Sequence, residues 1–258
     1  MKRILFLLIL FSSACMAQDY YYQPKPAPYT RPHSAYKDSL HQRMFFLSIN
    51  AGLSVPLRDY GSKDTAHNFM IIGPDSTNGK GFANIGFHGC IKGGIFLGPN
   101  YGLVGKLGLN YNTFDASTLN TIINGYYYYT INGGFSIWQF MGGAFANFKL
   151  EDNQSIWLEG MIGAVDANFP SFTVTIYNLA FNFDLQNATD FAWSLDMGYE
   201  KEITDNVSFV ANITYTASEL IYPTQTYNKY YYGSYTQHTP VTMSFGSLDF
   251  SIGLLFHL

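Results

Sequence analysis

Six ionisable residues stand inside otherwise apolar segments of this 258-residue chain. All six fall on the polar side of an apolar–polar alternation: Lys92, Lys106, Glu159, Asp196, Glu200 and Asp249. Lys92 and Lys106 lie at similar distances from a turn at residues 98–100, so they should be level on adjacent strands. We predict that the lysines face the acids across an enclosed interior, near short turns. Paired charges would plug that interior, whereas unpaired ones would line a gated pore or a proton path.

Nucleophilic catalysis needs a serine or cysteine with a base in reach, and the chain offers little sign of it. Its histidines are His33, His41, His67, His88, His238 and His257, and no Gly-x-Ser-x-Gly motif is present. His88 stands two residues from Cys90, but a single inward histidine in a polar interior is more often merely solvated. No pair of histidines has metal-ligand spacing. We therefore predict no catalytic residue, no metal and no cofactor.

Tyrosines gather in two stretches that lie between the alternating segments. The first holds Tyr126, Tyr127, Tyr128 and Tyr129, and the second holds Tyr230, Tyr231, Tyr232 and Tyr235. Tyrosine offers a large contact area with a polar tip, which suits a binding surface. The alternative is an aromatic girdle at a membrane–water boundary, together with strands that extend beyond the bilayer.

The element that must carry these residues is a β-strand, because successive side chains of a strand point to opposite faces. The last twelve residues, SLDFSIGLLFHL, show it best: every second residue is apolar, and Leu255 is the one exception on the other face. Eight such segments occur, at residues 45–55, 85–97, 102–113, 135–149, 155–168, 191–200, 207–218 and 243–258.

The connections between the segments alternate in length. Long ones cover residues 56–84, 114–134, 169–190 and 219–242, and the others are short turns. Only 12% of residues are charged, about half of the ~25% of soluble domains. No apolar run reaches the ~20 residues of a membrane helix. These features predict an all-β fold, an eight-stranded antiparallel transmembrane β-barrel with long extracellular loops and short periplasmic turns.

The N-terminal pattern predicts a targeting segment followed by a leader segment. Residues 1–17 combine a basic start, an apolar stretch and small residues, which predicts a signal peptide cut after Ala17. Lipidation at Cys15 is the alternative. Residues 18–43, rich in Pro and Tyr, predict an extended periplasmic leader, and residues 44–258 form the barrel. The net charge of -4 and the lack of a basic stripe predict no nucleic-acid partner.

Two stretches carry a family resemblance. Residues 47–60, LSINAGLSVPLRDY, resemble the first strand of small outer-membrane β-barrel proteins, and residues 81–86, GFANIG, resemble the entry to their second strand. The resemblance covers residues 45–258 and implies an eight-stranded barrel in a Gram-negative outer membrane, inserted by the barrel assembly machinery. That machinery commonly reads a terminal Phe or Trp, whereas this chain ends in Leu258.

We therefore expect a monomeric, non-enzymatic protein in contact with membrane lipid. Its role would be structural or surface interaction, with the loop tyrosines contacting a surface protein or a glycan. A narrow, porin-like channel for small solutes is the first alternative, and a lipid-modifying barrel enzyme is the second.

Overall fold

The computed structural model describes residues 44–63, 81–118, 127–151, 153–176, 179–185, 187–222, 225–229, 233–237 and 241–258. The predicted signal peptide (1–17), the leader (18–43), Tyr126 and residues 230–232 lie outside the described residues. Within the described ranges, no helix has the length and apolar character needed to cross a membrane.

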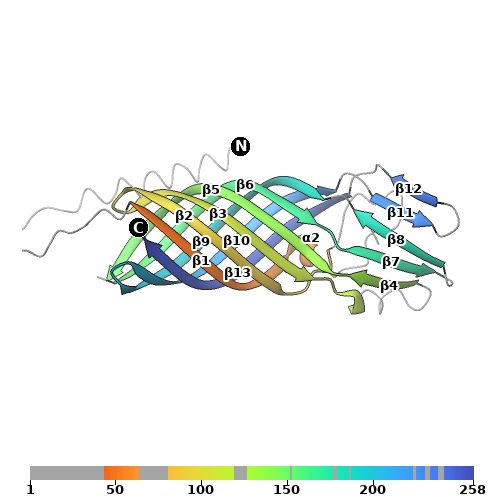
Figure 1. Ribbon diagram of the computed structural model, residues 1–258, viewed down its shortest axis with the longest axis horizontal. Helices are drawn as coiled ribbons and strands as arrows, with labels where there is room; N and C mark the ends of the chain where they lie inside the picture. Colours follow the sequence, from red (N-terminus) through yellow and green to blue (C-terminus); the bar gives the residue numbers. More distant parts are fainter. Residues whose placement is uncertain are drawn as a thin grey trace, which may run out of the picture. The chain divides into compact units, whose positions relative to one another are not determined.

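Eight antiparallel strands close into a barrel, which confirms the predicted fold class (Figure 1). In chain order they are β1 (Phe45–Leu57), β2 (Gly86–Gly98), β3 (Tyr101–Thr113), β5 (Gly134–Glu151), β6 (Gln154–Asn168), β9 (Ala188–Thr204), β10 (Val207–Tyr222) and β13 (Val241–His257). Around the barrel the order is β1-β13-β10-β9-β6-β5-β3-β2. The C-terminal strand closes the ladder on β1, where Phe46 pairs with His257 and Leu57 with Gly246.

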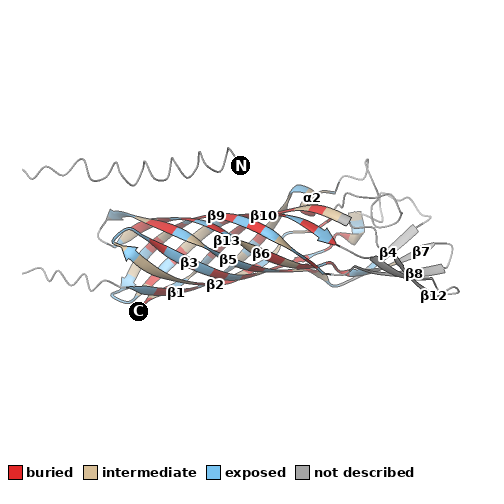
Figure 2. Ribbon diagram, turned by 90° about the horizontal axis from the view of Figure 1, so that it is seen from above, coloured by how far each residue is buried: buried red, intermediate tan, exposed pale blue. Residues whose placement is uncertain are grey.

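Side chains alternate between the wall's two faces, as the sequence pattern predicts. Figure 2 shows buried and exposed residues following one another along the barrel strands. The exposed face is strongly apolar and includes Ile49, Leu53, Phe87, Ile91, Leu107, Trp138, Phe140, Ile162, Phe191, Leu195, Met197, Phe250 and Ile252. Soluble proteins rarely expose an apolar surface of this size to water. The surface matches the lipid-facing band of a transmembrane barrel.

Two inward glycines make room for aromatic rings at the end with the short turns. A Cβ on Gly94 would lie 2.3 Å from a ring carbon of Phe46, and one on Gly102 would lie 2.6 Å from a ring carbon of Phe145. Each glycine is the cross-strand partner of the residue whose ring covers it. These glycines are therefore needed for packing, because a Cβ would meet the rings and also a carbonyl oxygen of the next strand, that of Leu103 at Gly94 (2.6 Å) and that of Ile95 at Gly102 (2.0 Å).

The long connections are not structureless, and here the sequence-based expectation is incomplete. Five further strands form a second, separate sheet in the order β12-β11-β8-β7-β4. They are β4 (Tyr127–Asn132), β7 (Ser171–Ile176), β8 (Leu179–Leu185), β11 (Gln225–Lys229) and β12 (Gly233–Gln237). Each is next in sequence to a barrel strand, and the two sheets keep the same strand order: β4, β7, β8, β11 and β12 adjoin β5, β6, β9, β10 and β13.

The first long connection begins differently, with the one-turn helix α2 (Arg58–Gly61). Arg58 (φ +57°), the first residue of α2, and Phe82 (φ +49°), whose N–H bonds to Ser62 O just after α2, adopt left-handed backbone conformations that cost non-glycine residues free energy. Backbone hydrogen bonds hold the two stretches together, from Gly81 N to Asp59 O (2.8 Å) and from Ala83 N to Tyr60 O (3.1 Å). This fixed arrangement buries Tyr60 completely.

Candidate functional site

The barrel lumen holds all six of the ionisable residues singled out from the sequence. Each is at least nine-tenths buried: Lys92, Lys106, Glu159, Asp196, Glu200 and Asp249. Lys92 and Lys106 are direct cross-strand partners, and so are Glu159 and Asp196. The structure divides the six residues among three clusters and one lysine whose ammonium has no hydrogen-bond partner in the described part of the chain.

The central cluster is built around Lys92. Its ammonium lies 2.8 Å from Glu159 Oε2 and 2.7 Å from Asp196 Oδ2, although the carboxylates are 67 and 104 residues away in sequence. Thr214 also donates a hydrogen bond to Asp196 Oδ2. One buried ammonium thus bridges two buried carboxylates, so that each carboxylate has a charged hydrogen-bond donor in the low-dielectric interior.

Lys106 departs from the prediction. Its Nζ has no hydrogen-bond partner among the described residues. Its side chain instead extends over Gly108, where a Cβ would lie 3.1 Å from Lys106 Cε and 3.4 Å from Gln139 Oε1. Among the described residues the hydrogen-bonded contacts with the acids are therefore made by Lys92 and not by Lys106, whose side chain extends into the space left by the missing side chain of Gly108.

A second cluster surrounds Asp249. Asn110 donates to Asp249 Oδ1 (3.1 Å) and to Ser54 Oγ (3.0 Å), and its Oδ1 lies 2.6 Å from His88 Nδ1. Because the Asn110 oxygen can only accept, His88 must carry a proton on Nδ1. His88 is fully buried, so the expectation of a solvated histidine is wrong, and its ring contacts Asn110 rather than Cys90.

A third cluster lies near the short turns and brings a serine, a histidine and a carboxylate together. His257 Nε2 is 2.9 Å from Glu200 Oε1 and 3.3 Å from Ser208 Oγ. A catalytic triad needs the serine and the acid on opposite ring nitrogens. Here both contact Nε2, while Nδ1 has no partner among the described residues. This arrangement orders Glu200, which also accepts hydrogen bonds from Trp157 and Ser155, but it does not activate Ser208.

His257 belongs to the third cluster but is not among the residues singled out from the sequence. The signal was present, since His257 continues the inward parity of Asp249, Ser251 and Leu255. Leu255, the exception in the alternation, is indeed buried inside the barrel.

Aromatic rings close the lumen at the short-turn end. We call Phe46, Phe96, Phe145 and Trp157 the short-turn plug. Every pair of these rings is in contact, with centroids 4.8–6.0 Å apart. Aromatic pairs packed in this way form a cohesive apolar layer at this end of the lumen.

A second group of rings closes the other end. We define the long-loop plug as Tyr60, Phe82, Phe114, Phe135, Phe169, Tyr222 and Phe245. Tyr60, from α2, packs on Phe135 (5.0 Å) and on Phe245 (5.1 Å), and Phe169 joins Phe135 to Tyr222. The polar clusters therefore lie between two apolar layers.

Outside the lumen, an ion pair ties two long connections together. Lys63 donates to Asp115 Oδ2 and to Asn84 Oδ1. Asp115 also accepts from the Ser117 hydroxyl and from Thr118. Burial of the Asp115 carboxylate would raise its pKa, but the hydrogen bonds from its three partners outweigh burial and hold the pKa well below its usual range.

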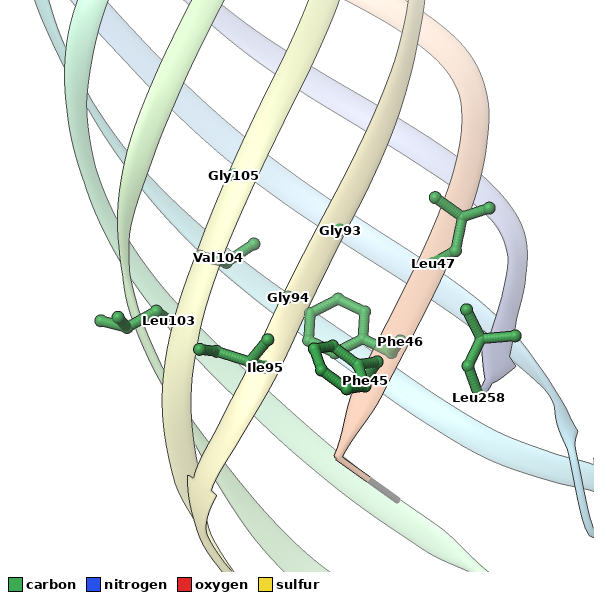
Figure 3. Close-up of a pocket in the computed structure, with 10 residues that line it drawn as sticks. All are labelled: Phe45, Phe46, Leu47, Gly93, Gly94, Ile95, Leu103, Val104, Gly105 and Leu258. Atoms are coloured by element: carbon green, nitrogen blue, oxygen red, sulfur yellow. The ribbon is translucent and has the colours of Figure 1, made fainter.

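The outer wall carries a shallow apolar depression of about 570 Å³ near the short turns (Figure 3). Gly93 and Gly105 form part of its floor, and Leu47, Leu103 and Leu258 rise beside them. It belongs to the same outward apolar surface as the rest of the wall. Among the described residues no group of three or more His, Cys, Asp or Glu is placed to hold a metal ion, and Cys90 is a buried free thiol.

The predicted loop surface is only partly described. Tyr127, Tyr128 and Tyr129 belong to β4, and Tyr235 belongs to β12. Tyr126, Tyr230, Tyr231 and Tyr232 lie outside the described residues.

No family model and no curated protein matches the chain. Solved structures that resemble it include Neisserial surface protein A, with 12% identity over 83% of this chain and 97% of that one, at a TM-score of 0.47. Ail, the attachment invasion locus protein of Yersinia pestis, shows 15% identity over 83% and 99%, at 0.40. The outer membrane protease OmpT from Escherichia coli shows 10% identity over 83% and 97%, at 0.47.

These similarities are too low to bear on activity. Eight closed antiparallel strands, an apolar outer wall and connections sorted by length decide the architecture. The chain has the fold of the small outer-membrane β-barrels.

Proposed function

We propose that this chain is a non-enzymatic outer-membrane protein that acts through surface contacts, with the barrel as its anchor. The long connections would then be extracellular, and the protein would be a monomer inserted by the barrel assembly machinery. The observation that carries the proposal is the contrast between the two parts of the fold. The lumen is filled by plugs and paired charges, while three long connections form an additional sheet.

The apolar outer wall supports the membrane location. Its exposed large side chains would otherwise face water, at a cost of about 25 cal/mol per Å² of apolar surface. Trp138, Trp193 and Tyr111 are exposed on this wall toward the end with long connections. Aromatic residues of this kind favour the membrane–water boundary.

The test is a binding screen with a loop-shortened control. Refolded, fluorescently labelled protein in detergent micelles is applied to arrays of glycans and of extracellular proteins. A variant with residues 170–187 replaced by Asn-Gly lacks β7 and β8. A second variant replaces Tyr230, Tyr231 and Tyr232 by Ser. We expect at least one ligand to bind the native protein and to be lost in both variants. Absence of binding from both arrays would contradict the proposal.

A narrow channel is the second candidate, because several buried polar atoms in the lumen lack a partner within the part of the chain that the structure describes. They include Lys106 Nζ, both polar atoms of the Gln139 side chain, Ser194 Oγ and Thr216 Oγ1. Such atoms would favour a hydrated path if the plugs moved. Conductance in planar bilayers that disappears in Lys106→Ala or grows in Glu159→Ala would support the channel. We expect no conductance steps from the native protein.

A further inference from the structure

Tyr60 is the central ring of the long-loop plug. It packs on Phe135 of β5, with 5.0 Å between the ring centroids, and on Phe245 of β13, with 5.1 Å. In the order of the barrel strands, three strands separate β5 from β13 in either direction, so the two lie on opposite sides of the barrel. A ring that contacts both therefore spans the mouth of the lumen. Tyr60 is completely buried there, although it belongs to a connection and not to a barrel strand.

The segment that carries Tyr60 begins at a strained backbone position. Arg58, two residues before Tyr60, has a φ of +57°. This left-handed conformation costs free energy for every residue except glycine, because the Cβ crowds the following carbonyl oxygen. The Arg58 side chain lies over Gly246, and its guanidinium is 3.5 Å from Phe245 O. The closed position of Tyr60 thus requires a conformation that Arg58 would otherwise avoid.

Two kinds of contact hold the segment in place against this strain. Within the long connection, Ala83 N donates a backbone hydrogen bond to Tyr60 O (3.1 Å). At the end of the segment, Lys63 forms an ion pair with Asp115 of the next long connection. The Lys63 side chain is 41% exposed, and ion pairs in contact with water contribute little to stability. The segment is therefore held by backbone hydrogen bonds and by a partly solvated ion pair.

Further inside the lumen lie polar groups without a hydrogen-bond partner in the described part of the chain. They include Lys106 Nζ, both polar atoms of the Gln139 side chain and Thr216 Oγ1, and the buried hydroxyl of Tyr60 is a further one. Buried polar groups normally bond to protein atoms or to water. An ammonium, an amide and hydroxyls in one enclosed region therefore suit water or small polar solutes.

We propose that residues 57–63 form a cap that moves away from the barrel mouth, with Arg58 as its hinge and Tyr60 as its stopper. Opening would relax the backbone at Arg58, break the ion pair of Lys63 with Asp115, and admit small polar solutes to the lumen from the long-loop end. The short-turn plug would stay in place, so the lumen would be a chamber with one entrance. This inference concerns the lumen and does not depend on the surface-contact function.

Cys90 makes the opening of the cap measurable. Its side chain lies in the lumen on β2, is 7% exposed, and has the Asn50 amide 3.7 Å from its sulfur. The chain contains two cysteines, so Cys15→Ser leaves Cys90 as the single thiol. The refolded full chain in detergent micelles is treated with 2-aminoethyl methanethiosulfonate, and mass spectrometry follows the modified fraction. When the cap recloses faster than the reagent reacts, the rate reports the fraction of open molecules.

Tyr60→Ala removes the stopper and should raise the rate of modification about tenfold or more, because the closed state loses the packing of a buried ring. The matched control is Tyr215→Ala, which lies on the outer wall beside Trp193 and should leave the rate unchanged. Lys63→Met should raise the rate about two- to fivefold, the range expected for a partly exposed ion pair. Different migration of unheated and boiled samples on a denaturing gel identifies the variants that are folded barrels.

A second pair of variants tests the hinge and leaves the stopper in place. Arg58→Ala and Arg58→Gly both delete the side chain, but alanine retains the cost of the left-handed backbone. Modification should therefore be about fivefold faster in Arg58→Ala than in Arg58→Gly. Equal rates in these two variants would overturn the inference. So would a rate in Tyr60→Ala no higher than in Tyr215→Ala, or a native rate as high as that of the chain unfolded in urea.

Discussion

At the scale of single residues, Lys92 and Lys106 show how position decides the energetic role of a buried charge. Both are lysines, they are cross-strand partners, and both are at least nine-tenths buried. In the described part of the chain, Lys92 forms ion pairs with two carboxylates, whereas Lys106 forms no hydrogen bond. Removing Lys92 would leave two buried anions without their cation, whereas removing Lys106 would break no ion pair.

We therefore expect Lys92→Met to lower the free energy of unfolding by about 3–5 kcal/mol, the usual cost of breaking a buried pair. Lys106→Met should cost far less. Urea unfolding of the refolded barrel, followed by tryptophan fluorescence, measures both. Equal losses in the two variants would show that the ion pairs of Lys92 contribute little.

The Asp115 ion pair predicts a pH dependence outside the membrane. Its pKa is lowered in the folded state, so its contribution to stability is complete above the unfolded pKa of about 4 and is lost as the pH falls below it. The thermal midpoint of the native protein should exceed that of Asp115→Asn by a constant amount above pH 5. The difference should shrink as the pH falls toward 3. A difference that is independent of pH would assign the effect to packing instead.

At the scale of elements, the barrel strands are built from the inside by size complementarity. Glycines at positions 94 and 102 receive the rings of Phe46 and Phe145, and these rings form half of the short-turn plug. The same strands carry open outward glycines, such as Gly105, where an added Cβ would have no contact closer than 3.9 Å. On β3, the inward Gly102 therefore makes room for a packed ring, whereas the outward Gly105 has open space beside it.

Gly102→Val and Gly105→Val make a matched pair on strand β3. Gly102→Val should clash with the Ile95 carbonyl oxygen as well as with the Phe145 ring, so it should cost at least the roughly 1–3 kcal/mol that overpacking of a core usually does. Gly105→Val should be neutral or slightly stabilising, because valine favours strands. Urea midpoints of the two variants provide the measurement, and a larger loss for Gly105→Val would refute this account of the plug.

At the scale of the whole molecule, the chain forms two sheets, of which one is closed into a barrel and the other is not. The barrel ladder is closed through β1 and β13 and includes none of β4, β7, β8, β11 and β12. A closed ladder has no free edge, so its stability does not need the second sheet. Among the described residues the second sheet instead ends in β4 on one side and in β12 on the other.

The variant with residues 170–187 replaced by Asn-Gly should therefore still fold as a barrel. On a denaturing gel, unheated and boiled samples should migrate differently for both the native protein and the variant, because a closed barrel resists detergent until it is boiled. Loss of this shift in the variant alone would mean that the second sheet is needed for barrel closure.

The sequence by itself determined the number of barrel strands, their inward and outward faces and the sorting of long and short connections. These features are local, since a strand alternates with a period of two wherever it forms. The same local signal was present in residues 171–176 and 179–185, but short segments are ambiguous without their neighbours. Only the tertiary structure could show that they pair across three connections.

Tertiary structure also decided which inward side chains meet. Strand stagger brings Lys92 to carboxylates 67 and 104 residues away, and the space over Gly108 takes Lys106 elsewhere. It placed His88 on Asn110 and His257 beside Glu200. Alternation determines whether a side chain points into the barrel or out of it. It does not determine the position of the residue along the barrel axis or the rotamer of its side chain, and these two features decide which side chains meet.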